Sequence, residues 1–355
     1  KTELHNKKFL GEDVKAIKIF ITNYKDAHAI ADQMGFPEII KRREYDINFI
    51  TKYIIEKKVK PLCWYEITGE ELNNSEEFGG VDRGIDVEVC LKVNKIFPLT
   101  KNLPDFSPKI LAYDIETDDY RVGQGEIIMI SLVGKNLKRV LTCKKPKGVV
   151  LPNFVEYYKD EAEMLEAFVK HVKKQEPDIL AGYFSDVFDL PYLRARAEKF
   201  GVRLSLGIDD SQPRFTRGIL PSGRIFGIVH ADLYKFVRTN YSQYLQSETL
   251  SLNEVASELL GEKKTGFEIK HSSTLDKQQW LDYFQYNLQD SVLAYKLAEK
   301  FWYDMNEFTK IVQEPLYNVS REAMSGHVEN YILHNLFHFD DIREKRPTYD
   351  EIRER

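Results

Sequence analysis

The sequence has 355 residues, a formal net charge of −5 and a pI near 6.0, so it is long enough for two domains. Hydrophobic residues make up 43% and charged residues 30%, as in ordinary globular proteins, and the lack of a long apolar run excludes a helical membrane span. The acidic balance argues against a surface that is basic throughout, although it permits a local basic patch beside an acidic site.

The start of the chain and its cysteines bear on its origin and compartment. No secretory signal is visible, and the chain begins at Lys1 without a methionine, as expected of a fragment or a trimmed chain. Cys63, Cys90 and Cys143 lie far apart and match no zinc-ligand spacing. They are therefore expected to be reduced thiols in a cytoplasmic protein.

Residues 1–60 mix strand and helix signals. Residues 16–22 alternate between apolar and polar side chains, which predicts a strand, and residues 24–34 predict a helix with Asn23 as its N-cap. Residues 39–49 resemble another strand, and residues 49–58 resemble another helix. This pattern predicts a small α/β domain without a catalytic constellation.

An acidic stretch and several prolines separate this part from the rest of the chain. Residues 66–88 contain Gly79 and Gly80 and are interpreted as a long loop, followed by a strand over residues 87–93. Three prolines then interrupt the pattern, at positions 98, 104 and 108. We place a domain boundary near residue 106 for this reason.

From residue 109 the pattern alternates between strands and helices. Strands are predicted over residues 109–117, 127–133, 139–143, 178–183 and 224–234. Helices are predicted over residues 162–174, 189–200, 277–312 and from a capping box at 251–254. This order predicts a mixed sheet flanked by helices. The last residues, 313–355, are predicted to be helical.

Two acids close the first strand of this region. Asp114 and Glu116 are two residues apart, so their side chains leave a strand on the same face. Paired carboxylates repel each other and are costly to desolvate, which favours a cation between them. Two solvated acids at a strand end are the alternative interpretation.

Further acids stand at positions that combine with this pair. Asp189 begins a predicted helix, where the helix dipole favours an acid, so a simple helix cap is the alternative to a functional role. Tyr286 and Asp290 are four residues apart on the predicted helix 277–312 and share one face of it. A solvated acid beside a packing tyrosine is the alternative there.

In their order along the chain and in their residues, these motifs resemble the three exonuclease motifs of family B DNA polymerases. The resemblance is greatest to the archaeal members of that family. Residues 114–116 are similar to the first motif, residues 188–193 to the second, and Tyr286 with Asp290 to the third. The likeness extends over nearly the whole chain and includes two further stretches, 230–234 and 316–321.

The resemblance implies a ribonuclease-H-like α/β exonuclease domain over residues 107–312 and a smaller α/β N-terminal domain over residues 1–106. It also implies that residues 313–355 form a helical segment that packs back on the N-terminal domain. The implied activity is metal-dependent 3′→5′ removal of nucleotides from a DNA primer end, with release of nucleoside 5′-monophosphates. The implied partners are single-stranded or frayed DNA and a polymerase domain or second polymerase subunit.

The resemblance assigns two divalent metal ions to four acids: Asp114, Glu116, Asp189 and Asp290. Hydrolysis of a phosphodiester needs an activated water and a stabilised leaving oxygen, and two metals together can supply both. Carboxylates suit Mg²⁺ and Mn²⁺ alike. Tyr286 is expected to orient the attacking water, with plain packing as the alternative, because sister exonucleases place a histidine where this chain has Gln285.

One residue departs from the archaeal pattern. Phe184 stands where an asparagine that contacts the site is usual, and a phenyl ring cannot make its hydrogen bonds. We expect Phe184 either to stack on a base of the frayed end or to serve local packing. Asp186 matches an acid outside the core four and is assigned a supporting role in DNA binding, whereas Asp232 is expected to serve loop geometry.

A local excess of basic residues follows the second motif. Residues 194–238 contain nine Lys or Arg against four Asp or Glu. They are candidates for contacts with DNA phosphates, Arg217 among them, or else form a solvated surface. Residues 214–224 are expected to form a hairpin near the path of the DNA.

The sequence holds no polymerase palm motif, so no polymerase activity is expected from this chain alone. A natural split subunit and a shortened chain both fit this observation, and a complete pocket for template uracil is not expected. The sequence therefore predicts the 3′→5′ exodeoxyribonuclease, or proofreading, module of a family B polymerase. One alternative is a non-catalytic part of a split polymerase that binds single-stranded DNA or acts as a scaffold, and a second is a structure-selective or RNA-directed nuclease on the same fold.

Overall fold

The computed structural model describes residues 1–72, 88–101, 103–104, 106–216, 221–262, 271–345, 347 and 353. The chain divides into two compact units. The smaller unit comprises Lys1–Cys63, Glu307–Pro315 and Met324–Arg355, and the larger comprises Trp64–Asn306 and Leu316–Ala323. These units are compact bodies and not family domains, so the boundaries predicted near residues 106 and 312 stay predictions.

The smaller unit is built on a hairpin and short helices. Its elements are β1 (Thr2–Phe9), β2 (Glu12–Ile19), η1 (Tyr24–Asp26), α1 (Ala27–Gln33), α2 (Phe49–Lys57), α9 (Met324–Asn335) and η5 (Leu336–Phe339). The two strands are antiparallel, and Asn23 caps η1 as predicted, because its side chain accepts a hydrogen bond from the backbone N–H of Lys25. The backbone of Lys8 in β1 forms hydrogen bonds with Asp340 and Ile342, so residues 340–342 lie alongside this hairpin.

Two predictions for the first hundred residues are wrong. Residues 39–48 form no strand, since no neighbouring strand pairs with them, and Ile40 is 93% exposed. Residues interpreted as the start of a loop instead form β3 (Tyr65–Glu71), which pairs antiparallel with β4 (Leu91–Pro98). Most side chains of β3 are exposed, so the alternation that signals a half-buried strand is missing. The rest of the predicted loop, residues 73–87, lies outside the described residues.

A mixed sheet of six strands forms the centre of the larger unit. In spatial order the strands are β12 (Val229–Asp232), β9 (Ile179–Gly182), β5 (Ile110–Thr117), β6 (Ile127–Gly134), β7 (Leu137–Thr142) and β8 (Val155–Tyr157). β5 runs antiparallel to β6 and parallel to β9, which places β5 in the interior of the sheet. All eight residues of β6 are buried, as the continuous apolar run predicts for a strand covered on both faces.

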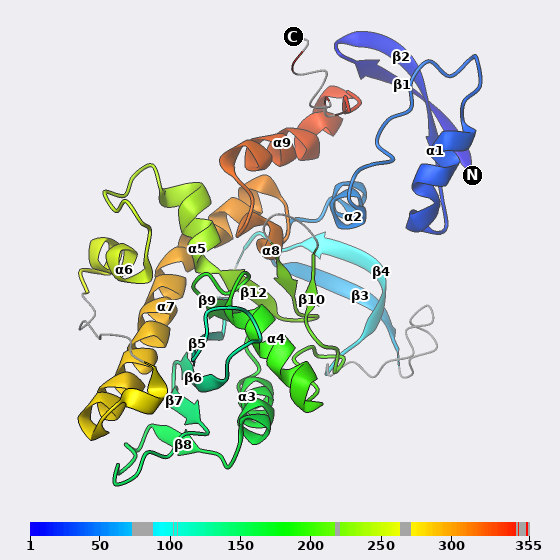
Figure 1. Ribbon diagram of the computed structural model, residues 1–355. Coiled ribbons are helices and arrows are strands. Elements are labelled where there is room, and N and C mark those ends of the chain that lie inside the picture. The colour runs from blue at the N-terminus through cyan, green and yellow to red at the C-terminus, as the bar shows by residue number, and fades with distance from the viewer. Residues whose placement is uncertain are drawn as a thin grey trace. The chain divides into compact units, whose positions relative to one another are not determined.

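Helices cover both faces of this sheet (Figure 1). On one face, α3 (Glu161–Gln175) and α4 (Asp189–Phe200) pack on odd-numbered residues of β5. On the other face, α7 (Lys277–Val312) packs on Ile110 and Ala112. The side chains of Asp114 and Glu116 therefore leave β5 on the face that α7 covers.

Shorter elements complete the larger unit. They are β10 (Arg214–Phe215), β11 (Gly223–Arg224), α5 (Leu233–Phe236), η3 (Val237–Tyr241), α6 (Leu252–Leu260), η4 (Ser272–Thr274) and α8 (Leu316–Val319). β10 and β11 are antiparallel, which confirms the predicted hairpin. The three cysteines are free thiols. Across the described residues, no helix combines the length and the apolar character that crossing a membrane requires.

Candidate active site

Three acids meet between β5 and α7. Asp114, Glu116 and Asp290 each offer a carboxylate oxygen within 4.8 Å of the others. Asp290 is buried, and the two acids of β5 are partly exposed. Opposite Asp114 the neighbouring strand presents Ser131, and the register of β5 shifts directly after Glu116, where the strand ends. The sheet and the helix thus concentrate three negative charges at one strand end.

Two further residues of α7 hold these acids in place, and neither was predicted from the sequence. The hydroxyl of Tyr283 donates to Oε2 of Glu116 at 3.1 Å. The side-chain amide of Asn287 donates to Oδ2 of Asp114 at 2.7 Å. Tyr283 lies three residues before Tyr286, and Asn287 lies three residues before Asp290, so the helix period is the signal that would have identified them.

A seam of serines fixes α7 on the sheet below the acids. The hydroxyl of Ser131 on β6 donates to the backbone carbonyl of Asn287 at 2.9 Å and lies 2.6 Å from the hydroxyl of Ser291. All three residues are fully buried, so these bonds are shielded from water. These hydrogen bonds fix the position of α7 along β6, and they thereby fix the position of Asp290 on that helix.

Asp189 lies apart from the cluster of three acids. It opens α4 and is buried, and its Oδ1 accepts a hydrogen bond from the backbone N–H of Ile115 at 3.1 Å. Burial raises the pKa of Asp189 to about 7, although the bond from Ile115 opposes this shift. The carboxyl of Asp189 is therefore oriented by the backbone of the same strand that carries Asp114 and Glu116.

Tyr286 lies on the same helix and is half-buried near the acids. Burial raises its pKa well above the usual value, and the negative charges of Asp290 and Glu116 add to the shift. Its phenol therefore stays protonated at neutral pH. A neutral hydroxyl of this kind can bond to a water but cannot act as a base.

The turn between β9 and α4 has an unusual backbone. Phe184 adopts a positive φ of 64°, a conformation that bulky side chains rarely take. Asp232 holds this turn, because its carboxylate accepts hydrogen bonds from the backbone N–H groups of Phe184 and Asp186 at 2.9 and 3.1 Å. The expectation that Asp232 serves loop geometry is thereby confirmed. The ring of Phe184 is 41% exposed and meets the ring of Tyr234 edge to face.

Glycines allow close packing at both ends of this turn. A Cβ atom on Gly182, the last residue of β9, would lie 2.5 Å from the Cβ of Ser185. A Cβ on Gly223 of β11 would lie 2.4 Å from the side chain of Leu190. Both distances are shorter than real Cβ contacts. At Gly182 the neighbour is a Cβ that cannot move without its backbone, so the close packing requires glycine, whereas at Gly223 the neighbour is a terminal methyl of Leu190, which can shift.

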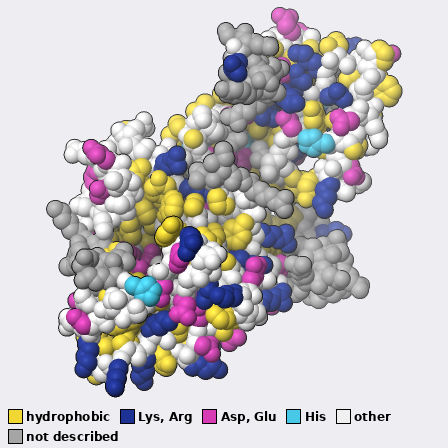
Figure 2. Space-filling model, in the orientation of Figure 1, with side chains coloured by type: hydrophobic (Ala, Val, Ile, Leu, Met, Phe, Trp, Pro, Cys, Tyr) yellow, Lys and Arg dark blue, Asp and Glu magenta, His cyan; other side chains and the backbone are white. Residues whose placement is uncertain are grey.

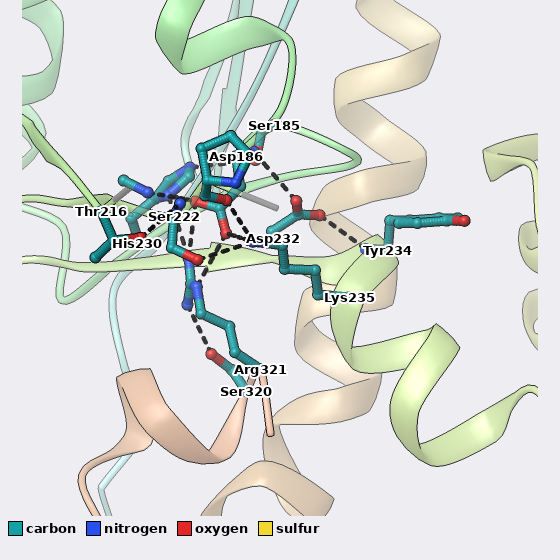
Figure 3. A network of polar contacts seen from close by, with 12 residues as sticks. Ser185, Asp186, Thr216, Ser222, His230, Asp232, Tyr234, Lys235, Ser320 and Arg321 are labelled. Carbon is teal, nitrogen blue, oxygen red and sulfur yellow. Dashed lines mark hydrogen bonds and ion pairs between the residues drawn. The ribbon is translucent and has the colours of Figure 1, made fainter. Parts of the chain in front are cut away.

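Asp186 is at the centre of a buried polar network (Figure 3). Its side chain is fully buried and lies 2.8 Å from Nζ of Lys235, 2.9 Å from Nε of Arg321 and 3.1 Å from Nδ1 of His230. Burial opposes ionisation of Asp186, but the hydrogen bond from His230 and the charge of Arg321 outweigh it and hold the pKa well below its usual range. A carboxylate enclosed in this way is not open to DNA, so the geometry does not support the DNA contact predicted for Asp186.

The basic residues of the stretch 194–238 do not all face solvent. Arg196 is buried and donates from Nε to Glu161 at 2.7 Å, and Lys235 is buried beside Asp186. Arg217 lies outside the described residues. On the face shown in Figure 2, basic and acidic side chains of the described residues are interspersed over the region of α3 and α4. The predicted basic excess is therefore partly used inside the fold.

Comparison with known proteins places this site in a family. The family model described as DNA polymerase family B, exonuclease domain, matches residues 40–255, which is more than half of the chain. The chain belongs to this family. The matched range includes Asp114, Glu116 and Asp189, whereas Asp290 lies beyond it.

Relatives of this family B member are archaeal DNA polymerases. The DNA polymerase of Pyrococcus glycovorans is 29% identical over 356 residues, covering 98% of this chain and 40% of that protein. The DNA polymerase of Thermococcus kodakarensis is 28% identical over 362 residues, covering 100% of this chain and 19% of that protein. The chain thus spans less than half the length of the relatives it matches.

A solved structure supports the fold of this family B member. The structure of the family B DNA polymerase from the hyperthermophilic archaeon Pyrobaculum calidifontis matches with a TM-score of 0.80 and 21% identity, covering 98% of this chain and 43% of that one. Together with the mixed sheet flanked by helices, this match confirms the predicted ribonuclease-H-like fold class.

Proposed function

We propose that this chain is a metal-dependent 3′→5′ DNA exonuclease, the proofreading module of a family B polymerase. The observation that carries the proposal is the convergence of Asp114, Glu116 and Asp290 within 4.8 Å, in a chain of this exonuclease family. Like charges held this close destabilise the fold unless a cation compensates them. A cluster kept at such a cost indicates a site for chemistry.

The three clustered acids fit a divalent cation, because hard carboxylate oxygens are the ligands that Mg²⁺ and Mn²⁺ prefer. In the proposed site Asp189, which stands outside this cluster, would join Asp114, Glu116 and Asp290 in holding two such ions. When bound, such ions activate a water and stabilise the leaving oxygen of a phosphodiester, so that nucleoside 5′-monophosphates are released. These ligands lie on regular elements, the strand β5 and the helices α4 and α7, which hold them in place before substrate binds.

The remaining side chains orient rather than react. Tyr283 and Asn287 hold the carboxylates of Glu116 and Asp114 at fixed angles through single hydrogen bonds. Tyr286 remains protonated and orients the attacking water through its hydroxyl. The alternative role of Tyr286, packing alone, predicts that its replacement by Phe leaves the rate unchanged.

Phe184 suits the end of a single strand. Its exposed ring lies beside Tyr234 on the turn that leads to Asp189, where an unpaired terminal base can stack. This aromatic pair also favours the second candidate function, binding of single-stranded DNA without hydrolysis in a split polymerase. The intact acid cluster favours the enzyme.

Release of labelled mononucleotides from a 3′-labelled single strand tests the proposal. The unaltered chain with Mg²⁺ or Mn²⁺ is compared with the double variant Asp114→Ala plus Glu116→Ala. Asp119→Asn is the matched control, because this nearby acid pairs only with Arg121 among the ion pairs of the described chain and stands outside the cluster.

Release by the unaltered chain and the control, but not by the double variant, supports the exonuclease. Binding of the strand without release, with either metal, favours the binding module. Equal release from the double variant would show that the acid cluster is not the active site.

A further inference from the structure

We propose that Arg321 is a positioning residue of the nuclease site and acts through Asp186 on the turn that carries Asp189. The inference deepens the proposed function and rests on it. Arg321 follows α8 and belongs to the segment Leu316–Ala323 of the larger unit, far along the chain from the three acidic motifs.

The contact between Arg321 and Asp186 has the geometry of a strong pair. Nε of Arg321 donates to Oδ2 of Asp186 at 2.9 Å, and one terminal nitrogen donates to Oδ1 at 3.2 Å. This fork fixes the carboxylate in plane and rotation, which a single point charge does not do. The side chain of Arg321 is 9% exposed and that of Asp186 is fully buried, so water screens the pair little.

Arg321 is itself held in place. Its guanidinium lies 4.1 Å from the ring centroid of Tyr317 and donates to the hydroxyl of Ser320 at 2.9 Å. The opposite side of the network is equally fixed, because Lys235 donates to the hydroxyl of Ser222 and Gly223 donates its N–H to Asp186. The Arg321–Asp186 pair is therefore anchored on both sides and cannot shift as a unit relative to the surrounding residues.

The turn held by this network is strained and leads directly to a proposed ligand. Phe184 has a left-handed φ, which persists only where surrounding bonds impose it. Asp186, two residues later, has its N–H bonded to Asp232 and its carboxylate bonded to Arg321, so backbone and side chain are both fixed. Asp189 lies three residues after Asp186, within one helical turn. The network therefore controls the position of Asp189.

A purely structural ion pair would act on stability alone, whereas a positioning pair acts on rate. Misplacement of a reacting group by about 1 Å costs on the order of 100-fold in rate. The structure offers a matched structural pair on α4. Arg196 donates to Glu161 with the same fork, and its side chain is 2% exposed against 9% for Arg321, but Glu161 bonds to the backbone of Ile127 and not to the turn.

The test compares Arg321→Ala, Arg321→Lys and the control Arg196→Lys in the full chain. Steady-state release of mononucleotides gives kcat and KM, and amide hydrogen exchange of residues 183–190 reports the turn without requiring activity. We expect Arg321→Ala to lower kcat by about 10- to 100-fold with KM nearly unchanged, and to accelerate exchange in the turn. Arg321→Lys keeps the charge but not the fork, so we expect partial rescue, and it carries the test if the alanine variant does not fold.

Normal kcat and normal exchange in the Arg321 variants would overturn the proposal and leave Arg321 a stabilising residue only. Equal losses of kcat in Arg196→Lys would also overturn it, since loss of any buried pair would then suffice. If the unaltered chain releases no nucleotide, the proposed function fails, and exchange of residues 183–190 alone decides whether Arg321 holds the turn.

Discussion

Neutralising one acid of the cluster should stabilise the metal-free chain, which is the reverse of the usual effect of a buried substitution. In Asp290→Asn the amide keeps the shape of the side chain and removes its charge. Two charges 4.8 Å apart repel by about 0.9 kcal/mol in water and about 3.5 kcal/mol at an effective dielectric constant of 20. Asp290 faces two such neighbours, Asp114 and Glu116, both partly exposed and therefore partly screened. We expect a gain of about 1–2 kcal/mol in the free energy of unfolding.

Bound metal should reverse the order of stability, so that the unaltered chain becomes more stable than Asp290→Asn. A cation bound only by the folded chain adds about 2.7 kcal/mol at a concentration 100 times its Kd. The unaltered chain should gain this stabilisation, and Asp290→Asn, with one ligand fewer, should gain much less. Denaturant unfolding in chelator and in Mn²⁺ measures both effects. Asp282→Asn is the control, because it removes an exposed acid from the same helix.

Two results would refute this reasoning. If Asp290→Asn is less stable than the unaltered chain in chelator, the carboxylates do not repel as the geometry requires. If Mn²⁺ stabilises both proteins equally, the cluster is not where the metal binds.

Three further predictions concern neighbouring side chains. Tyr283→Phe removes the hydroxyl that donates to Glu116, so kcat for nucleotide release should fall about tenfold. Tyr303→Phe, a change of an exposed residue on the same helix, is the control and should have no effect. An unaltered kcat for Tyr283→Phe would contradict the role of this hydrogen bond. Phe184→Ala removes the stacking ring, worth roughly 1–3 kcal/mol per base, so KM for a single strand should rise about tenfold at constant kcat; an unchanged KM would count against stacking. Asp186 has a folded pKa below its unfolded value, so its ion pairs stabilise the fold fully above about pH 4 and less as the pH falls further. In urea unfolding the unaltered chain should be more stable than Asp186→Asn at pH 7, and this advantage should begin to shrink below about pH 4 and continue to shrink toward the much lower folded pKa; a difference that stays constant from about pH 7 to about pH 2 would disprove the linkage.

The parts of the site that the sequence predicts are those with a short-range signal. The spacing of Asp114 and Glu116 on a strand predicts a shared face, and α7 indeed covers that face. The predicted helix 277–312 coincides with α7, because its apolar period is long and uninterrupted. The assignment of all four acids, Asp114, Glu116, Asp189 and Asp290, as metal ligands stays a prediction.

The parts that the sequence does not predict depend on contacts between distant residues. Arg321 and Asp186 are 135 positions apart, and no local pattern indicates that they meet. β3 was not predicted because its sequence contains three glutamates and Gly69, residue types that are depleted in strands. Residues 39–48 show the converse, since a β-like composition forms no strand without a partner strand.

The two glycines beside the nuclease turn have a consequence for genetic screens. Every other amino acid at Gly182 places an atom 2.5 Å from the Cβ of Ser185, so saturation mutagenesis should recover no active substitution there, whereas a Cβ at Gly223 meets the terminal methyl of Leu190, which can shift, so small residues should be tolerated better. Loss of nucleotide release in variants at Gly182 would therefore indicate crowding of the scaffold and not a missing catalytic group, because glycine has no side chain to contribute to the reaction.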